Sequence, residues 1–191
     1  MKPHIITLTG SLGSGKSSTA NGVAKILGYQ RFSAGDFQRA AAASMGITYE
    51  EYQKVAEKDP SCDRRADDAL VDAGTKGDSV IDARLGYHFI PSSYKVMLRL
   101  DPSIAAARIL KDAESNPNRH NEMAGGAHDV ETIVTSIEKR RENDKQRYKQ
   151  FYNIENPFDA NNFDLVVDTS ARPLEEVIQI VINGYQKWLE S

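Results

Sequence analysis

The chain has 191 residues, a formal net charge of -3 and 27% charged residues, which fits one compact domain with its own core. No run approaches the roughly 18 apolar residues of a membrane span, and no basic tail or stripe marks a nucleic-acid binder. The single cysteine, Cys62, excludes an internal disulfide and argues against a cysteine-held metal cluster. With no signal-peptide pattern, we expect a cytoplasmic protein, either a monomer or a dimer, without nucleic-acid or membrane partners.

Apolar runs alternate with helical patterns along the chain, which favours βα units and a mainly parallel sheet. The capping-box pair Thr48 and Glu51 predicts a helix start within 36–75, which is mostly helical in pattern. The polar segment 114–129 predicts a mobile loop. Strands are expected at 4–9, 29–35, 78–83, 94–100 and 164–169, and other helices at 16–27, 102–113, 130–152 and from Pro173.

The stretch GSLGSGKSS, residues 10–18, lies between the first expected strand and a helix. Its glycines let backbone N–H groups approach phosphate oxygens, and the helix presents its positive end to the same anion. In such a P-loop, Lys16 bridges the terminal phosphates and Ser17 ligands Mg²⁺. We therefore predict a site for a Mg-nucleotide triphosphate; the alternative is a glycine-rich turn that carries a lysine. The predicted binding residues are Gly10, Ser11, Gly13, Ser14, Gly15, Lys16, Ser17 and Ser18.

One face of the expected helix 130–152 mixes apolar and charged residues. At about 100° per residue, six positions share this face. Charges that face a core are costly unless they are paired or bind an anion, so we predict that the two arginines stabilise a phosphoryl group during transfer. The alternative is an ordinary surface Arg–Asp pair. The six residues are Ile133, Ile137, Arg140, Asp144, Arg147 and Phe151.

Two further sets of residues complete the candidate site. Asp82 and Arg84 end an expected strand, where open α/β sheets place their ligands. Asp82 is a candidate to orient Mg²⁺ or to take the acceptor's proton, and Arg84 to hold an acceptor phosphate; the alternative is a strand-end aspartate that caps a turn. Arg39 follows Gly35 by one helical turn. Alone it is weak evidence for a binding site, because an arginine in the first turn of a helix is usually solvated. Asp63 or Asp67 is a candidate to contact the acceptor base, the alternative being a solvated helix face.

Taken together, these residues resemble the cytidylate kinase family, and the shorter archaeal-type members in particular, within the P-loop nucleoside monophosphate kinases. The resemblance covers nearly the whole chain, including SAGDFQR, VIDARL, VMLRLDPSIAAARI and RRENDKQRYKQFYNI. It implies a three-layer α/β/α fold with a mainly five-stranded parallel sheet, built from 1–35, 76–113 and 130–191 as one domain. A small helical region at about 36–75 would bind the nucleoside monophosphate, and a mobile lid would occupy about 114–129. The implied activity is the phosphorylation of CMP and dCMP by ATP with Mg²⁺.

The resemblance also implies roles for individual residues. Ser33 or Ala34 falls where the family often has a serine that contacts the acceptor. Arg108 matches the lid-base arginine near the donor nucleotide, and Asp144 matches the aspartate between two arginines. The matches to the acceptor-phosphate and transition-state arginines are Arg39, Arg84, Arg140 and Arg147. The family often has Asp-Gly-Arg-Asp or Glu-Gly-Arg where this chain has Asp82-Ala83-Arg84-Leu85, which removes a polar contact to the acceptor. Two alternatives therefore stay open: a kinase for UMP, AMP or a non-nucleotide metabolite, and a non-catalytic ATP-binding regulator.

Overall fold

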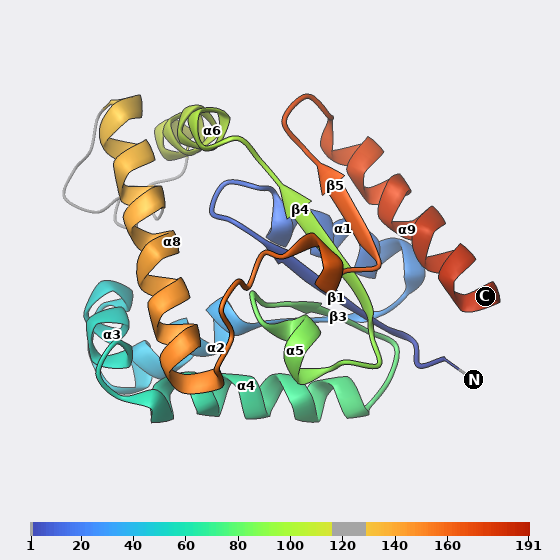
Figure 1. The fold of residues 1–191 in the computed structure, drawn as a ribbon, viewed down its shortest axis with the longest axis horizontal. Helices are drawn as coiled ribbons and strands as arrows, with labels where there is room; N and C mark the ends of the chain where they lie inside the picture. Colours follow the sequence, from blue (N-terminus) through green and yellow to red (C-terminus); the bar gives the residue numbers. More distant parts are fainter. Residues whose placement is uncertain (1, 116–128) are drawn as a thin grey trace.

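The computed structural model describes residues 2–115 and 129–191, and its centre is a five-stranded parallel sheet (Figure 1). The strand order is β2-β3-β1-β4-β5. Parallel strands place all their carboxyl ends at one edge of the sheet, which is where loops can gather around a ligand. The strands are β1 (Ile5–Gly10), β2 (Gln30–Ser33), β3 (Ser79–Asp82), β4 (Tyr94–Arg99) and β5 (Leu165–Asp168).

The strand predictions are confirmed in place, and the second one ends earlier than expected. β2 stops at Ser33, whereas 29–35 was the expected strand. The reason is local: the Ser33 hydroxyl accepts a hydrogen bond from the backbone N–H of Asp36 at 3.3 Å. A serine in this position caps a helix, and α2 (Ala34–Ser44) begins at the next residue.

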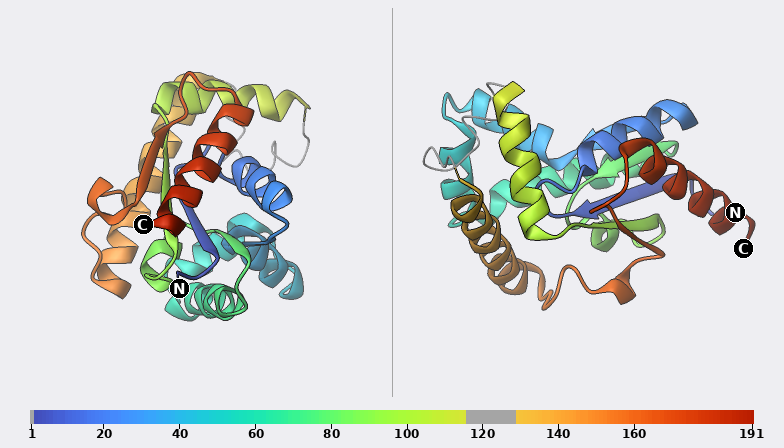
Figure 2. Two further views of the ribbon diagram at one scale, coloured as in Figure 1. Left: turned by 90° about the vertical axis from the view of Figure 1, so that its right-hand side faces the viewer. Right: turned by 90° about the horizontal axis from the view of Figure 1, so that it is seen from above.

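One face of the sheet is covered by α1 (Lys16–Leu27) and α9 (Leu174–Glu190). Side chains alternate along a strand, so Ile6 and Leu8 of β1 face these helices while Ile5 faces the opposite layer. α1 ends as predicted at Leu27 and is followed by Gly28, whose φ of 71° is left-handed. The two ends of the described chain also meet here, since Lys2 Nζ donates to the Ser191 hydroxyl at 2.6 Å (Figure 2).

The opposite face is covered by α4 (Pro60–Thr75) and the short α5 (Gly86–Phe89). Leu70 of α4 and Ile90 pack there against Ile5 and Ile81 of the sheet. The sheet is therefore buried on both faces, as all-parallel sheets are. The predicted three-layer α/β arrangement is confirmed.

A second, smaller core holds α2, α3 (Tyr49–Ala56) and α4 together. Buried Ala42, Tyr52 and Cys62 come one from each helix. The predicted capping box at the start of α3 is present in both halves, from the Thr48 hydroxyl and from the Glu51 carboxylate. The helical pattern of 36–75 thus forms three helices, with the first starting two residues earlier.

The longest helix, α8 (Val130–Tyr152), packs against α6 (Pro102–Ser115). Ile133 and Ile137 of the predicted face are buried there against Ala105 and Ile109. Asp129 starts α8 by accepting the backbone N–H of Thr132 at 2.8 Å. The 3₁₀ turn Ala160–Asn162 precedes β5.

The predicted lid at about 114–129 lies outside the described residues, apart from the last residues of α6 and Asp129. In the part of the chain that the structure describes, no helix has the length and apolar character needed to cross a membrane.

Candidate active site

A cavity of about 810 Å³ opens at the carboxyl edge of the sheet, between the loop after β1, the start of α2 and the middle of α8. This volume is within the usual range for small-molecule sites. Among the described side chains, the predicted site residue Asp144 is buried and does not line it. The predicted residues that do line it are Gly10, Ser11, Gly13, Ser14, Gly15, Lys16, Ser17, Ser18, Ser33, Arg39, Asp82, Arg84, Arg108, Arg140 and Arg147.

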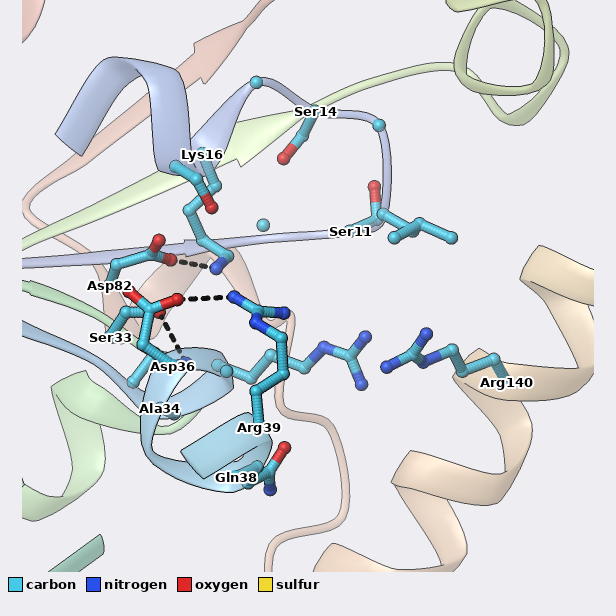
Figure 3. A pocket seen from close by; sticks show the side chains of 18 of the residues that line it. Ser11, Ser14, Lys16, Ser33, Ala34, Asp36, Gln38, Arg39, Asp82 and Arg140 are labelled. Atoms are coloured by element: carbon cyan, nitrogen blue, oxygen red, sulfur yellow. Dashed lines mark hydrogen bonds and ion pairs between the residues drawn. The ribbon is translucent and has the colours of Figure 1, made fainter. Parts of the chain in front are cut away.

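The loop after β1 is tightly wrapped (Figure 3). Gly13 has a φ of 78°, and a Cβ there would meet the Ala105 carbonyl oxygen and Cβ at 3.1 Å. The buried Ser14 hydroxyl has no hydrogen-bond partner among the described residues. α1 starts directly after the loop, so the first-turn N–H groups that lack intrahelical partners face the cavity. A loop of this form offers donors and positive potential to an anion.

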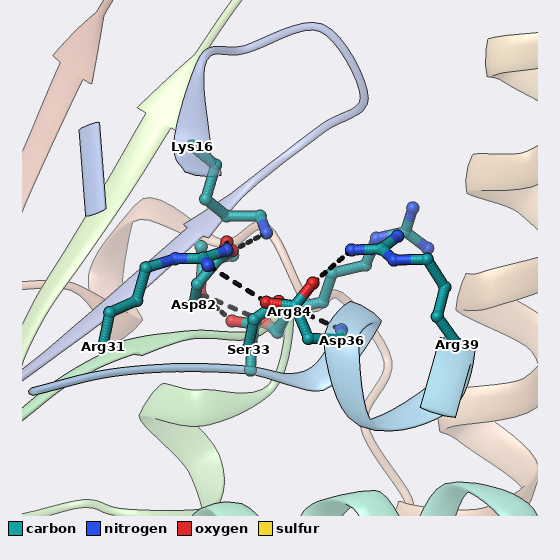
Figure 4. A network of polar contacts seen from close by, with 9 residues as sticks. Lys16, Arg31, Ser33, Asp36, Arg39, Asp82 and Arg84 are labelled. Carbon is teal, nitrogen blue, oxygen red and sulfur yellow. Dashed lines mark hydrogen bonds and ion pairs between the residues drawn. The ribbon is translucent and has the colours of Figure 1, made fainter. Parts of the chain in front are cut away.

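Lys16 and Asp82 form an ion pair at the floor of the cavity (Figure 4). The Asp82 side chain is 1% exposed, and its second oxygen accepts from Arg31 Nη2 at 2.7 Å. Burial opposes ionisation of Asp82, but Lys16 and the hydrogen bond from Arg31 hold its pKa below the usual value. Burial lowers the pKa of Lys16 even though Asp82 counteracts the shift. Asp82 is therefore an ionised carboxylate at neutral pH.

Arg31 is a cavity residue that the sequence reasoning missed. Besides Asp82, it pairs with Asp36, whose Oδ2 accepts from Arg31 Nη1 at 3.0 Å. Asp36 in turn accepts from Arg39 Nη2 at 2.5 Å. The available signal was strand alternation, because a period of two places Arg31 on the same side of β2 as Ser33.

Asp144 joins α8 to the end of β3. Its carboxylate pairs with Arg84 and also accepts from Arg147 Nη2 at 3.1 Å. Burial works against the charge of Arg84, but Asp144 and Tyr148 together raise its pKa above the usual value. The predicted charged stripe on α8 therefore faces inward, and its aspartate orients two of the predicted arginines.

Arg140 and Arg108 line the cavity in different ways. Arg140 is half-buried and points from α8 into the cavity (Figure 3). Among the residues that the structure describes, no carboxylate pairs with it. Arg108 is tied to the loop after β5, since its Nη2 donates to the carbonyl oxygens of Thr169 at 2.6 Å and Ser170 at 3.2 Å.

Polar side chains form the end of the cavity near α2, α3 and α4. Asp67 Oδ2 accepts from the Tyr152 hydroxyl at 2.6 Å. Gln38 Oε1 accepts from the Tyr49 hydroxyl and from Gln53 Nε2, both at 3.2 Å. Such groups suit the polar edge of a ring system. The side chain of Asp63, the other candidate from this helix, lies outside the described part.

Apolar side chains line the same end of the cavity. Leu85 is buried against Tyr148 and lines the cavity. Tyr148 and Tyr152 pack in that cluster and also line the cavity.

The residues around Ser17 fit a magnesium ion. Ser17 and Asp82 both line the cavity, and the Ser17 side chain is close enough to the Asp82 carboxylate to help hold its pKa down. Mg²⁺ prefers oxygen ligands and is usually held by one or two protein groups plus substrate phosphates. Within the described residues, no group of three or more His, Cys, Asp or Glu forms a metal cage. This donor set therefore suits an ion that arrives with phosphates.

Comparison with known proteins identifies related sequences. The cytidylate kinase-like family model matches residues 5–171. A cytidylate kinase of Methanothrix thermoacetophila is 33% identical over 165 residues, which cover 86% of this chain and 88% of that protein. A S-adenosylmethionine-dependent nucleotide dehydratase of Lacinutrix mariniflava is 30% identical over 184 residues, or 95% of this chain but 36% of that longer protein.

Solved structures share the fold at lower identity. A shikimate kinase from Bacteroides thetaiotaomicron superposes with a TM-score of 0.62 at 14% identity and 98% coverage of both chains. A gluconokinase from Sinorhizobium meliloti gives a TM-score of 0.58 at 18% identity, covering 99% of this chain and 95% of that one. The five-stranded parallel sheet is thus the fold of small-molecule kinases. Together with the match over residues 5–171, the curated relatives show that the chain belongs to the cytidylate kinase-like family.

Proposed function

We propose that the protein transfers the γ-phosphoryl group of ATP to a nucleoside monophosphate, with CMP and dCMP as the preferred acceptors. The observation that carries this proposal is that one cavity is lined both by the phosphate loop and by Arg39, Arg84, Arg140 and Arg147. A loop that binds one nucleotide does not need a second set of cations. Those cations suit a second phosphate and the charge that moves between the two.

The donor end consists of the phosphate loop and α1. Lys16 follows the charge of the terminal phosphates, and the N–H groups of the loop hold them. Ser17 and Asp82 would hold Mg²⁺, which neutralises charge on the phosphates when bound. Arg108, tied to the loop after β5, supports the donor nucleoside.

The acceptor end consists of α2, α3, α4 and the end of β3. Arg39 and Arg84 hold the acceptor phosphate in line with the donor. A phosphate monoester has a second pKa of about 6, so its attacking oxygen is mostly deprotonated at neutral pH and needs no general base. This oxygen bonds to the γ-phosphorus, the bond from that phosphorus to the β-phosphate oxygen breaks, and ADP leaves. Arg140 and Arg147 stabilise the charge of the group in transfer.

The choice of cytosine rests on the polar end of the cavity and on the relatives. Asp67 is an acceptor suited to an amino group such as that of cytosine, and Ser33 also lines the cavity. The curated relative from Methanothrix thermoacetophila is a cytidylate kinase. Leu85 favours the alternative of another small acceptor, because it presents an apolar surface to the same space.

A panel assay tests this proposal. The protein is incubated with ATP, Mg²⁺ and each of CMP, dCMP, UMP, AMP and GMP, and the products are identified. ADP and CDP or dCDP should form together, and Lys16→Ala should abolish both. Transfer to a different acceptor would shift the assignment to another kinase. ADP release without any acceptor dependence, or ATP binding without turnover, would favour the regulator and reject a kinase.

A further inference from the structure

We propose that Arg31 is a positioning residue for the acceptor phosphate, an inference that rests on the proposed function. Arg31 lies on β2, at the edge of the sheet, and its guanidinium enters the cavity wall (Figure 4). It pairs with two carboxylates from different elements, Asp82 at the end of β3 and Asp36 in the first turn of α2. Its role is to hold α2, and through it Arg39, against the floor of the cavity.

The ion pairs form one chain of alternating charge across the cavity wall. From the donor end to the acceptor end, each cation is followed by a carboxylate, and each carboxylate is shared by two cations. Arg31 is the middle member, so its loss divides the chain into two separate pairs. The members in order are Lys16, Asp82, Arg31, Asp36 and Arg39.

The two carboxylates that Arg31 pairs with differ in burial. Arg31 therefore links the exposed Asp36 to the buried Asp82. The side chain of Asp82 is 1% exposed and that of Asp36 is 53% exposed. Without Arg31, the Asp36–Arg39 contact would be an exposed pair three residues apart, and such pairs contribute little. Bonded to Arg31, Asp36 is fixed to a buried carboxylate through a planar guanidinium whose geometry suits two acceptors.

Arg39 is held in a defined place by this arrangement. Its guanidinium lies over the first turn of α2, where a Cβ on Gly35 would meet Arg39 Nη2 at 3.4 Å. Asp36 accepts from the same Nη2 through Oδ1, while its Oδ2 accepts from Arg31 Nη1. The guanidinium of Arg39 is therefore already oriented when an acceptor phosphate binds. Such pre-organisation raises the affinity, because less conformational entropy is lost on binding.

The test compares Arg31→Met with the wild type. The substitution keeps an unbranched apolar stem and removes both ion pairs. We expect the Kd and KM for CMP to rise about tenfold, near the lower end of the cost of one charge-assisted hydrogen bond. The Kd for ATP, measured by calorimetry without acceptor, should rise less than the Kd for CMP, because Asp82 keeps its ion pair with Lys16. Arg31→Lys should recover part of the CMP affinity, because a single ammonium can keep one of the two contacts.

Two further variants connect the effect to Asp36. Lys76→Met removes an exposed pair with Asp72 on α4, away from the cavity, and should leave both affinities unchanged. Asp36→Asn should also weaken CMP binding. The double variant Arg31→Met with Asp36→Asn should bind CMP no more weakly than the single variant with the lower affinity, because both substitutions break the contact between Arg31 and Asp36.

Several outcomes would reject the role of Arg31. Unchanged CMP affinity in Arg31→Met rejects it outright. If the two substitutions lower the CMP affinity additively in the double variant, Arg31 does not act through Asp36. If Arg31→Met lowers the affinity for ATP more than that for CMP, Arg31 belongs to the donor end. If Arg31→Met does not fold, full CMP affinity in Arg31→Lys rejects the need for two contacts. A wild-type protein that neither binds nor phosphorylates CMP overturns the proposed function instead, which separates the two failures.

Discussion

At the scale of single residues, the arginines of the cavity differ in what holds them. Arg84 and Arg147 share the buried Asp144, and Arg39 pairs with Asp36. Arg140 has no carboxylate partner within the described chain, although it is half-buried and faces the cavity. Partial burial of a cation without a counter-ion is costly. A phosphoryl group in transfer would supply the missing negative charge.

Arg140→Ala should therefore remove catalysis with little effect on stability. We expect kcat to fall by about a thousandfold, as for other cations that serve a phosphoryl transition state. The free energy of unfolding should not fall by more than about 0.5 kcal/mol, because no ion pair is lost and the cost of the unpaired charge is relieved. Steady-state kinetics with ATP and CMP and urea unfolding measure the two quantities.

The neighbouring Arg141 provides the control. Arg141 is exposed and lies over the ring of Phe158, with its Cζ 5.6 Å from the ring centroid, and it does not line the cavity. Arg141→Ala should retain near-full kcat. Equal losses in the two variants would mean that α8 is sensitive to any lost arginine, and Arg140 would have no special role.

At the scale of elements, the phosphate loop depends on a backbone shape that only glycine adopts easily. Gly13→Ala places a Cβ against the backbone oxygen of Ala105, in addition to the cost of a left-handed φ. That cost alone is about 1–2 kcal/mol. We expect the free energy of unfolding to fall by at least this amount and the Kd for ATP to rise at least tenfold, because the loop must shift to relieve the contact. Calorimetry and urea unfolding test both.

Gly28→Ala is the matched control for Gly13→Ala. Gly28 has a similar φ of 71°, but a Cβ there meets nothing within 4 Å, and it follows the far end of α1. Its stability loss should therefore be about 1–2 kcal/mol, from strain alone, with the affinity for ATP unchanged. If both variants bind ATP equally well, the close approach of Gly13 to α6 does not shape the site.

The sequence patterns predicted elements better than they predicted neighbours. Periodicity located the five strands and the inward face of α8, because each signal lies within one segment. Arg31 was missed because its importance depends on β2 lying beside β3, where Ser33 is in register with Asp82. No local pattern encodes that adjacency. The pairing of Asp144 with Arg84 was missed for the same reason, since 60 residues separate the two partners.

At the scale of the whole molecule, charge is distributed unevenly. The chain carries a net charge of -3, whereas cations outnumber carboxylates among the described residues that line the cavity. A concave site of this kind concentrates field lines and attracts anions even to an acidic protein. Binding of two phosphate-bearing substrates should therefore weaken as salt is raised. The lining cations are Lys16, Arg31, Arg39, Arg84, Arg108, Lys111, Arg140 and Arg147, and the lining carboxylates are Asp36, Asp67, Asp82 and Asp112.

The closing helix α9 is held to the sheet by an aromatic cluster that should make the fold sensitive to alkali. The rings of Tyr94 on β4 and Tyr185 on α9 lie 5.8 Å apart, and Trp188 lies 5.5 Å from Tyr94. Burial, with a smaller contribution from Asp164, raises the pKa of Tyr94 to about 12. Burial and the hydrogen bond with Tyr29 raise the pKa of Tyr185 as well.

A raised pKa in the folded state means that the unfolded chain loses its tyrosine protons first. The contribution of Tyr94 to stability is complete below its unfolded pKa of about 10 and is lost as the pH rises toward about 12. In that window, each such tyrosine lowers the free energy of unfolding by up to about 1.4 kcal/mol per pH unit. Tyr94→Phe keeps the ring and cannot ionise, so its free energy of unfolding should fall less steeply than that of the wild type above about pH 10. Urea unfolding at a series of pH values measures the two slopes; parallel curves through this window would show that Tyr94 ionises as readily in the folded protein as in the unfolded chain.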